Sequence, residues 1–298
     1  MKSSLVLATL VSLSTVSAFA GDYYQIGSTW GKHVLKKEDL ATASDSVKKA
    51  AFGLGEAARH GGSLFYLGKY QGWHIAATNH HVYPGGCRED SIDFPFLDGA
   101  SVDCVSLIGT WPEIDLTIVV LDVPKKYDEL FTSHALKFDF DSDLVPGQKL
   151  VNLGFGQHKN PTYSPVVDES DNCMVISPRN ASRQMGDVVP NPDPAFNVWS
   201  FAHGCENSQG DSGSAILDRS SGKIVGVVWT TKEPKIERVQ DNTYVALLTK
   251  QPGNADVWAE LSYGVPAFKI KEVLTKASKD SNLRQFARDV LADIVSGK

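Results

Sequence analysis

The chain carries the stretch SLFYLGKYQGWHIAATNHHV at residues 63–82, and this stretch decides how the central part of the chain is expected to fold. Two runs of β-forming residues, 63–67 and 73–78, flank the turn-like segment Lys69-Tyr70-Gln71-Gly72. Short runs joined by a turn that contains Gly are typical of a β-hairpin. The stretch ends in Thr78-Asn79-His80-His81-Val82, which places two histidines where the second strand runs into a loop.

Further short β-like runs follow the hairpin, and they set the expected fold class. They lie at residues 102–108, 116–121, 149–154, 174–177, 198–202, 215–217, 224–229 and 258–263. Many short strands with turn signals between them predict an all-β barrel or sandwich. Residues 266–298 differ, because Pro266 suits a first helical position and apolar residues then recur at helical spacing in two segments. We expect two C-terminal α-helices there.

The segments before the hairpin differ from it in composition and in hydrophobic pattern. Residues 36–58 are rich in Ala, Lys, Asp and Glu without strand alternation, which predicts a helical or loose extension. Their stretch GLGEAA (53–58) partly matches a dinucleotide-binding fingerprint, but no strand is expected before it, so we assign no nucleotide site. Residues 1–20 combine Lys2, an apolar stretch and Ala18-Phe19-Ala20, which predicts a signal peptide cleaved before Gly21.

Composition and charge exclude several classes of protein. Of the 298 residues 42% are hydrophobic, which is too many for a disordered chain. The 35 Asp and Glu exceed the 29 Lys and Arg, and no basic run stands out, so we expect no nucleic-acid partner and no anionic membrane surface. No later segment is apolar for long enough to span a bilayer. We expect a protein that is secreted or periplasmic, with no membrane contact after signal cleavage.

The cysteines support an oxidising compartment. An exported chain with an even set of four is expected to form two disulfides, and four cysteines allow three pairings. We favour Cys87–Cys104 and Cys173–Cys205, because each pair is adjacent in the sequence and closes one loop. There is no Cys-x-x-Cys and no His at zinc-finger spacing, so no metal centre is expected.

The strongest chemical motif is Gly210-Asp211-Ser212-Gly213-Ser214. By itself it is compatible with a plain β-turn. A nucleophilic serine also needs a base to take its proton, a group that orients the base, and N–H donors for the oxyanion. A nucleophilic serine in this chain therefore needs a histidine and a carboxylate from elsewhere in the sequence.

Candidates for the base and for its orienting group are present. His80 and His81 compete for the base. Asp115 opens the apolar run Leu116–Val120, and a buried carboxylate at such a place needs a partner; the alternative is an aspartate that merely ends a turn. Asp93 and Asp103 are weaker candidates, because neither opens an apolar strand.

Three motifs in this order resemble the chymotrypsin-like (trypsin-like) serine peptidases. They are Thr-Asn-x-His-Val ending at Val82, Asp-Leu-x-Ile-Val from Asp115, and Gly-Asp-Ser-Gly-Ser around Ser212. The first is closest to the bacterial branch that includes the V8-type glutamyl endopeptidases. The order His, Asp, Ser distinguishes this group from subtilisins and α/β-hydrolases. The resemblance extends from about residue 61 to residue 273.

The resemblance implies a role for each motif residue. Ser212 is the expected nucleophile, His81 the general base and Asp115 the residue that orients His81. The expected oxyanion hole consists of the N–H groups of Gly210 and Ser212. The expected substrate-binding residues are Glu206, Val228, Trp229 and Thr230. A carboxylate at position 206 would favour a Lys or Arg side chain of the substrate, whereas the His that glutamate-specific relatives place on the pocket wall is missing here.

The resemblance also implies a domain plan with two antiparallel six-stranded β-barrels, at residues 61–140 and 141–265, followed by helices at 266–298. Residues 21–60 are then an N-terminal extension or the propeptide of a zymogen. The trypsin branch begins its mature chain with Ile-Val-Gly-Gly, whose amino group pairs with the Asp before the Ser. That start is missing here, so the role of Asp211 stays open.

These expectations combine into a secreted serine endopeptidase. It would act on protein or peptide substrates through an acyl-enzyme without a cofactor, and a protein inhibitor is a further expected partner. The main alternative is a catalytically inactive, secreted binding module on the same fold. An esterase of another fold would need Gly-x-Ser-x-Gly, and Ser214 breaks that motif.

Overall fold

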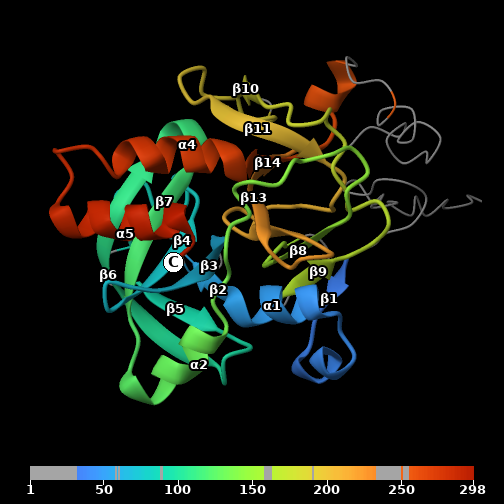
Figure 1. The fold of residues 1–298 in the computed structure, drawn as a ribbon. Coiled ribbons are helices and arrows are strands. Elements are labelled where there is room, and N and C mark those ends of the chain that lie inside the picture. The colour runs from blue at the N-terminus through green and yellow to red at the C-terminus, as the bar shows by residue number, and fades with distance from the viewer. Residues whose placement is uncertain are drawn as a thin grey trace, which may run out of the picture.

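The computed structural model describes residues 32–57, 59, 61–87, 90–157, 163–189, 191–232, 250 and 255–298. The predicted signal peptide, residues 1–20, lies outside the described residues. Two β-rich halves with few helices make up the described fold, which confirms the predicted fold class (Figure 1). None of the described helices is long and apolar enough to cross a membrane.

The first half is a closed barrel of six antiparallel strands in the order β2-β3-β4-β7-β6-β5. Its strands are β2 (Leu54–Ala57), β3 (Gly62–Tyr70), β4 (Trp73–Thr78), β5 (Ser91–Phe94), β6 (Ala100–Trp111) and β7 (Leu116–Asp122). The predicted hairpin is β3–β4, and its turn uses the positive φ angles of Gln71 and Gly72. Tyr66, Phe94 and Phe131 fill the barrel interior.

The barrel begins earlier than the sequence suggested, because β2 lies inside the segment that was expected to be an extension. Its residues, Leu54-Gly55-Glu56-Ala57, have little intrinsic preference for a strand. Gly55 is required by packing: a Cβ there would lie 2.8 Å from Ile92 and 3.1 Å from Leu64. A tertiary contact of this kind leaves no periodic signal, so the strand was not predicted.

The second half is an eight-stranded antiparallel sheet, where six strands were expected. Its order is β1 (His33–Val34), β9 (Val166–Asp168), β8 (Leu150–Gly154), β12 (Ala215–Asp218), β13 (Ile224–Thr231), β14 (Ser262–Pro266), β11 (Val198–His203) and β10 (Arg183–Met185). The very short strands β1, β9 and β10 were not predicted. The run 174–177 forms only isolated bridges, and the run 258–263 becomes a strand only from Ser262 on.

The N-terminal segment is part of the fold. After β1 come a 3₁₀ turn, Lys37–Ala41, and helix α1, Asp45–Gly53, which begins at the N-cap Ser44. The buried face of α1 packs Val47 and Ala51 into the main core. The described residues 32–57 therefore contribute to both halves, through β1 on one side and β2 on the other.

Three further short helical segments connect the strands. They are the 3₁₀ turns Pro112–Ile114 (η2) and Lys125–Tyr127 (η3), and helix α2, Asp128–Ser133. A fourth 3₁₀ turn, Ala255–Trp258 (η5), precedes β14. The turn η2 matters most here, because it ends directly at Asp115.

The two predicted C-terminal helices are present as α4 (Ala267–Ala277) and α5 (Gln285–Ser296). Figure 1 shows them in red, lying side by side against the body of the protein. Helix α4 contacts β13 and β14, while α5 contacts β3, so the helices connect the two halves. Ile270, Leu274 and Leu291 on their apolar faces belong to the main core.

Both predicted disulfides are confirmed. Cys87 pairs with Cys104 in the first half, and Cys173 pairs with Cys205 in the second. The first joins the loop before β5 to β6, and the second holds the chain just before the Gly210–Ser214 motif to the segment after β9.

Candidate active site

His81 lies in the loop that follows β4, at the position where the sequence placed it. The loop is held by Asn79, whose buried side chain donates a hydrogen bond of 2.9 Å to the carbonyl oxygen of Asp115. The side chain of His81 is 38% exposed, which leaves part of the imidazole ring accessible from the surface.

Asp115 is fully buried and both of its carboxylate oxygens contact His81. Oδ2 lies 2.7 Å from Nδ1 of the ring, and Oδ1 accepts a bond of 2.9 Å from the backbone N–H of His81. Asp115 ends η2 with a φ of 40°, a left-handed conformation that aspartate adopts more readily than most residues. The carboxylate therefore fixes the ring and the backbone of one histidine at the same time.

The adjacent histidine points elsewhere. Nδ1 of His80 lies 2.6 Å from Oγ1 of Thr110, which in turn lies 2.7 Å from Oγ1 of Thr117. Of the two histidines that competed in the sequence, only His81 contacts the Asp115 carboxylate. Asp93 and Asp103 lie on strands β5 and β6, where they pair with other residues of that hairpin.

The acid–base properties of this pair follow from its surroundings. Burial lowers the pKa of His81, but the hydrogen bond and charge of Asp115, with a contribution from the charge of Asp187, outweigh burial, so the pKa lies above its ordinary value of 6.5. Burial raises the pKa of Asp115, and its hydrogen bonds from His81 oppose that change. An imidazole in this setting can accept and return a proton near neutral pH.

The direction of the His81 shift predicts a pH profile. If His81 is the general base that the sequence predicts, kcat/KM for a peptide substrate should fall on the acid side with a midpoint above 6.5, because the base must be neutral to accept a proton. Asp187→Asn removes one of the charges that raise this pKa, so its midpoint should move to lower pH. Profiles of both proteins on one uncharged peptide substrate test this, and an unchanged or higher midpoint in the variant would contradict it.

Ser212 lies in a tight turn between the loop after Cys205 and strand β12. Gly210 and Gly213 both have positive φ angles, 97° and 84°. A Cβ at Gly210 would overlap with the carbonyl oxygen of Phe155, and one at Gly213 would overlap with that of Ser63. The backbone conformation therefore requires glycine at both positions, and so does the close contact with the carbonyl oxygens of other segments of the same chain.

The turn leaves two backbone donors without a partner among the described residues. The N–H groups of Asp211, Gly213 and Ser214 all donate to backbone carbonyls. Within the described part of the chain, the N–H groups of Gly210 and Ser212 make no such bond. These are the two donors that the sequence assigned to an oxyanion hole.

Ser63 was not predicted, although it connects the barrel to this turn. Its backbone N–H donates to the carbonyl of Ser212 at 2.7 Å, and its Oγ donates to the carbonyl of Gly210 at 2.8 Å. Thr78 holds Ser63 in turn, through a bond of 2.6 Å to its carbonyl oxygen. The contact joins residues about 150 positions apart, and no local motif signals it.

His81 and Ser212 line one pocket of about 340 Å³. Three of the four predicted substrate-binding residues, Val228, Trp229 and Thr230, line it as well. Asp187 lines it too and accepts a hydrogen bond from the hydroxyl of Thr230. Sequence reasoning missed Asp187, because it lies in an irregular segment after β10 with no motif around it.

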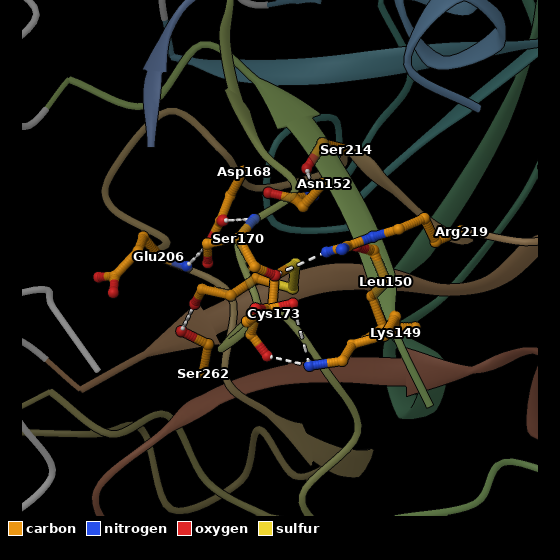
Figure 2. Close-up of a disulfide and its surroundings, with 12 residues drawn as sticks. Lys149, Leu150, Asn152, Asp168, Ser170, Cys173, Glu206, Ser214, Arg219 and Ser262 are labelled. Carbon is orange, nitrogen blue, oxygen red and sulfur yellow. Dashed lines mark hydrogen bonds and ion pairs between the residues drawn. A yellow bond between two sulfur atoms is a disulfide. The ribbon is translucent and has the colours of Figure 1, made fainter. Parts of the chain in front are cut away.

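Glu206, the fourth predicted substrate-binding residue, does not line this pocket. It is 1% exposed, and its backbone N–H donates to Oδ2 of Asp168 at 2.7 Å. Figure 2 shows its carboxylate pointing away from the disulfide and from Asp168. Cys205 lies seven residues before Ser212, and the chain from Cys205 to Glu206 is fixed there by the disulfide and by a bond from the Ser262 hydroxyl to the Cys205 carbonyl.

One group of potential metal ligands occurs among the described residues, namely Asp168, Cys173 and Cys205. The two sulfur atoms are bonded to each other in the disulfide of Figure 2, so they offer no thiolate. Asp168 instead accepts backbone hydrogen bonds from Ser170 and Glu206. The Asp168 carboxylate therefore holds the backbone at Ser170 and the backbone at Glu206 together.

Comparisons with known proteins give a likeness in structure. No protein-family model and no curated protein matches the chain. Rv3671c of M. tuberculosis H37Rv, described for a second structure as a protease, is 14% identical over 83% of this chain and 98% of its own in the inactive form of its serine-to-alanine mutant, with a TM-score of 0.50. The HtrA-type protease AlgW with a tripeptide is 14% identical over 84% of this chain and 65% of its own, with a TM-score of 0.49. At this identity the likeness to Rv3671c concerns the fold, and the chain has a chymotrypsin-like fold.

Proposed function

We propose that this chain is a serine endopeptidase. The observation that carries the proposal is that Asp115, fully buried, binds the ring of His81 while His81 and Ser212 line one pocket. A carboxylate, an imidazole and a serine at one cleft provide a nucleophile, a base and an orienting group.

The reaction follows from these positions. Oγ of Ser212 attacks the substrate carbonyl carbon while Nε2 of His81 takes its proton, and Asp115 stabilises the imidazolium that forms. The N–H groups of Gly210 and Ser212 bind the oxyanion. The peptide C–N bond then breaks as His81 returns the proton to the leaving amine. Water, activated by His81 in the same way, hydrolyses the acyl-enzyme and regenerates Ser212.

The proposal includes export and the bacterial, V8-type branch. Two disulfides support an oxidising compartment, in agreement with the expected signal peptide at residues 1–20. The form of the motif around His81 supports the branch. We also propose that its substrates are proteins or peptides, and that a protein inhibitor binds in the same cleft.

A preference for basic substrate side chains is also proposed, with Asp187 as its source. Asp187 lines the pocket beside His81, whereas Glu206 does not. A substrate Lys or Arg in this pocket would meet the Asp187 carboxylate, and such charge-assisted contacts stabilise binding.

The test is hydrolysis of matched chromogenic peptides that carry Arg, Glu or Phe before the cleaved bond. We expect the Arg peptide to be preferred, and Asp187→Asn to lower the Arg-to-Phe ratio of kcat/KM by about tenfold, the equivalent of ~1.4 kcal/mol. Glu206→Gln is the matched control and should keep the ratio. A ratio that falls in Glu206→Gln instead would assign the preference to Glu206. No hydrolysis of any peptide or of a denatured protein would favour the inactive binding module.

A further inference from the structure

A buried ion pair joins the N-terminal segment to the residue before Ser212. Nζ of Lys32 lies 2.5 Å from Oδ2 of Asp211, and the two side chains are 4% and 0% exposed. The residues are 179 positions apart in the sequence. Removing two charges from water costs free energy that is repaid only by good geometry and further hydrogen bonds. The Asp211 carboxylate therefore needs further hydrogen bonds in its buried site.

The Asp211 carboxylate is held from three segments of chain. Oδ1 accepts a bond of 3.0 Å from the N–H of Gly156, and Oδ2 accepts one of 2.8 Å from the N–H of Ser208 as well as the contact from Lys32. A Cβ at Gly154 or at Gly156 would overlap with this carboxylate. The end of β8 and the loop after it thus leave a space that the Asp211 side chain fills.

The segment that carries Lys32 is itself anchored. The next residues form strand β1, in which His33 and Val34 pair with β9. Leu35 is buried and its N–H donates to the carbonyl of Pro165 at 2.8 Å. The ammonium group is therefore presented from a fixed backbone.

From this arrangement we propose that Lys32 is a positioning residue of the active site. Its ammonium group holds Asp211, and Asp211 fixes the turn from Ser208 to Gly213 so that the N–H groups of Gly210 and Ser212 face the substrate. The inference rests on the proposed peptidase function and deepens it.

The cation is a lysine side chain, so the contact needs no new amino terminus produced by cleavage. Residues from Lys32 onward then belong to the working enzyme, and a cut between Lys32 and the barrel would separate the ammonium from the body it stabilises. The sequence left the role of Asp211 open. Its partner, Lys32, lies in residues 21–60, the segment that was a candidate propeptide.

The test compares Lys32→Ala with Lys37→Ala in the full chain. Lys37 is the matched control, because it also pairs with an aspartate, Asp98, but at 3.2 Å and on the surface. We expect Lys32→Ala to lower kcat on a small peptide ester by about 10- to 100-fold with little change in KM, since loss of an oxyanion donor acts on the transition state. Lys37→Ala should match wild type.

Two further measurements separate positioning from folding. Added n-propylammonium, but not propanol, should restore part of the kcat of Lys32→Ala, because a small cation can enter the space of the missing side chain. If Lys32→Ala does not fold, the double variant Lys32→Met/Asp211→Asn leaves no buried unpaired charge, and as a folded protein it should show the same loss of kcat.

Failure of the proposed peptidase function and failure of the proposed role of Lys32 give different results. A folded wild-type protein that hydrolyses nothing overturns the proposed peptidase function. A wild-type protein that hydrolyses the ester, together with a folded Lys32 variant of equal kcat, overturns the role of Lys32 alone. Loss of kcat with equal rescue by propanol and propylammonium would also overturn it, since the charge would then be irrelevant.

Discussion

Replacement of His81 by alanine is expected to lower kcat by at least about 10³-fold, whereas replacement of His80 is expected to leave kcat within about threefold of wild type. The two residues are neighbours, yet only His81 binds the Asp115 carboxylate and lines the pocket with Ser212. His80 contacts Thr110 instead. Each variant loses one imidazole, and the two positions are adjacent. Only His81→Ala is expected to lose most of its activity.

The measurement is steady-state hydrolysis of one peptide substrate by wild type, His81→Ala and His80→Ala, with thermal unfolding of each protein as the control for folding. His80→Ala loses contacts with Thr110 and Phe196, so a small decrease in its melting temperature is compatible with the account. Equal losses of kcat in two folded variants, or a larger loss in His80→Ala, would contradict the assignment of the base.

The local motifs allowed much of the candidate site to be predicted. The stretch around His81, the carboxylate at the head of β7 and the turn around Ser212 each have a sequence trace, because strand ends and glycine turns are local features. The cysteine pairs were also predictable, since each closes one loop between neighbouring parts of the chain.

The residues that sequence reasoning missed act over long distances. Ser63 binds the turn at Ser212, and Lys32 binds Asp211 across 179 positions. Asp187 enters the pocket from an irregular segment. A lone Ser, Lys or Asp has no pattern that separates it from the many others in the chain. Tertiary packing alone brings these side chains to the site: Ser63 reaches it from the barrel, whereas Lys32 and Asp187 reach it from segments next to β1 and β10 of the eight-stranded sheet.

The same reason explains why strand β2 and the backbone contacts of Glu206 were not predicted. Strand β2 is built around Gly55, which the packing of Ile92 and Leu64 requires but strand preference disfavours. Glu206 was placed by counting back from Ser212, whereas the disulfide of Cys205 and the Asp168 carboxylate fix the backbone there in another way. Counting along a motif fails where covalent and buried polar contacts redirect the chain.

Covalent labelling shows whether Ser212 is an activated nucleophile. The reagent is a fluorescent fluorophosphonate. A serine oxygen whose proton is removed by a neighbouring base attacks its phosphorus, the P–F bond breaks, and fluoride leaves. Wild type is compared with Ser212→Ala, and Ser214→Ala is the matched control. Ser214 lies two residues away and is buried against Asn152, and the chemistry does not use its hydroxyl.

We expect wild type and Ser214→Ala to be labelled at one site, and Ser212→Ala to lose the label completely while it stays folded. The corresponding loss of peptide hydrolysis should be on the order of 10⁴-fold or more. A folded wild-type protein that takes no label, or a label that persists in Ser212→Ala, would contradict the account.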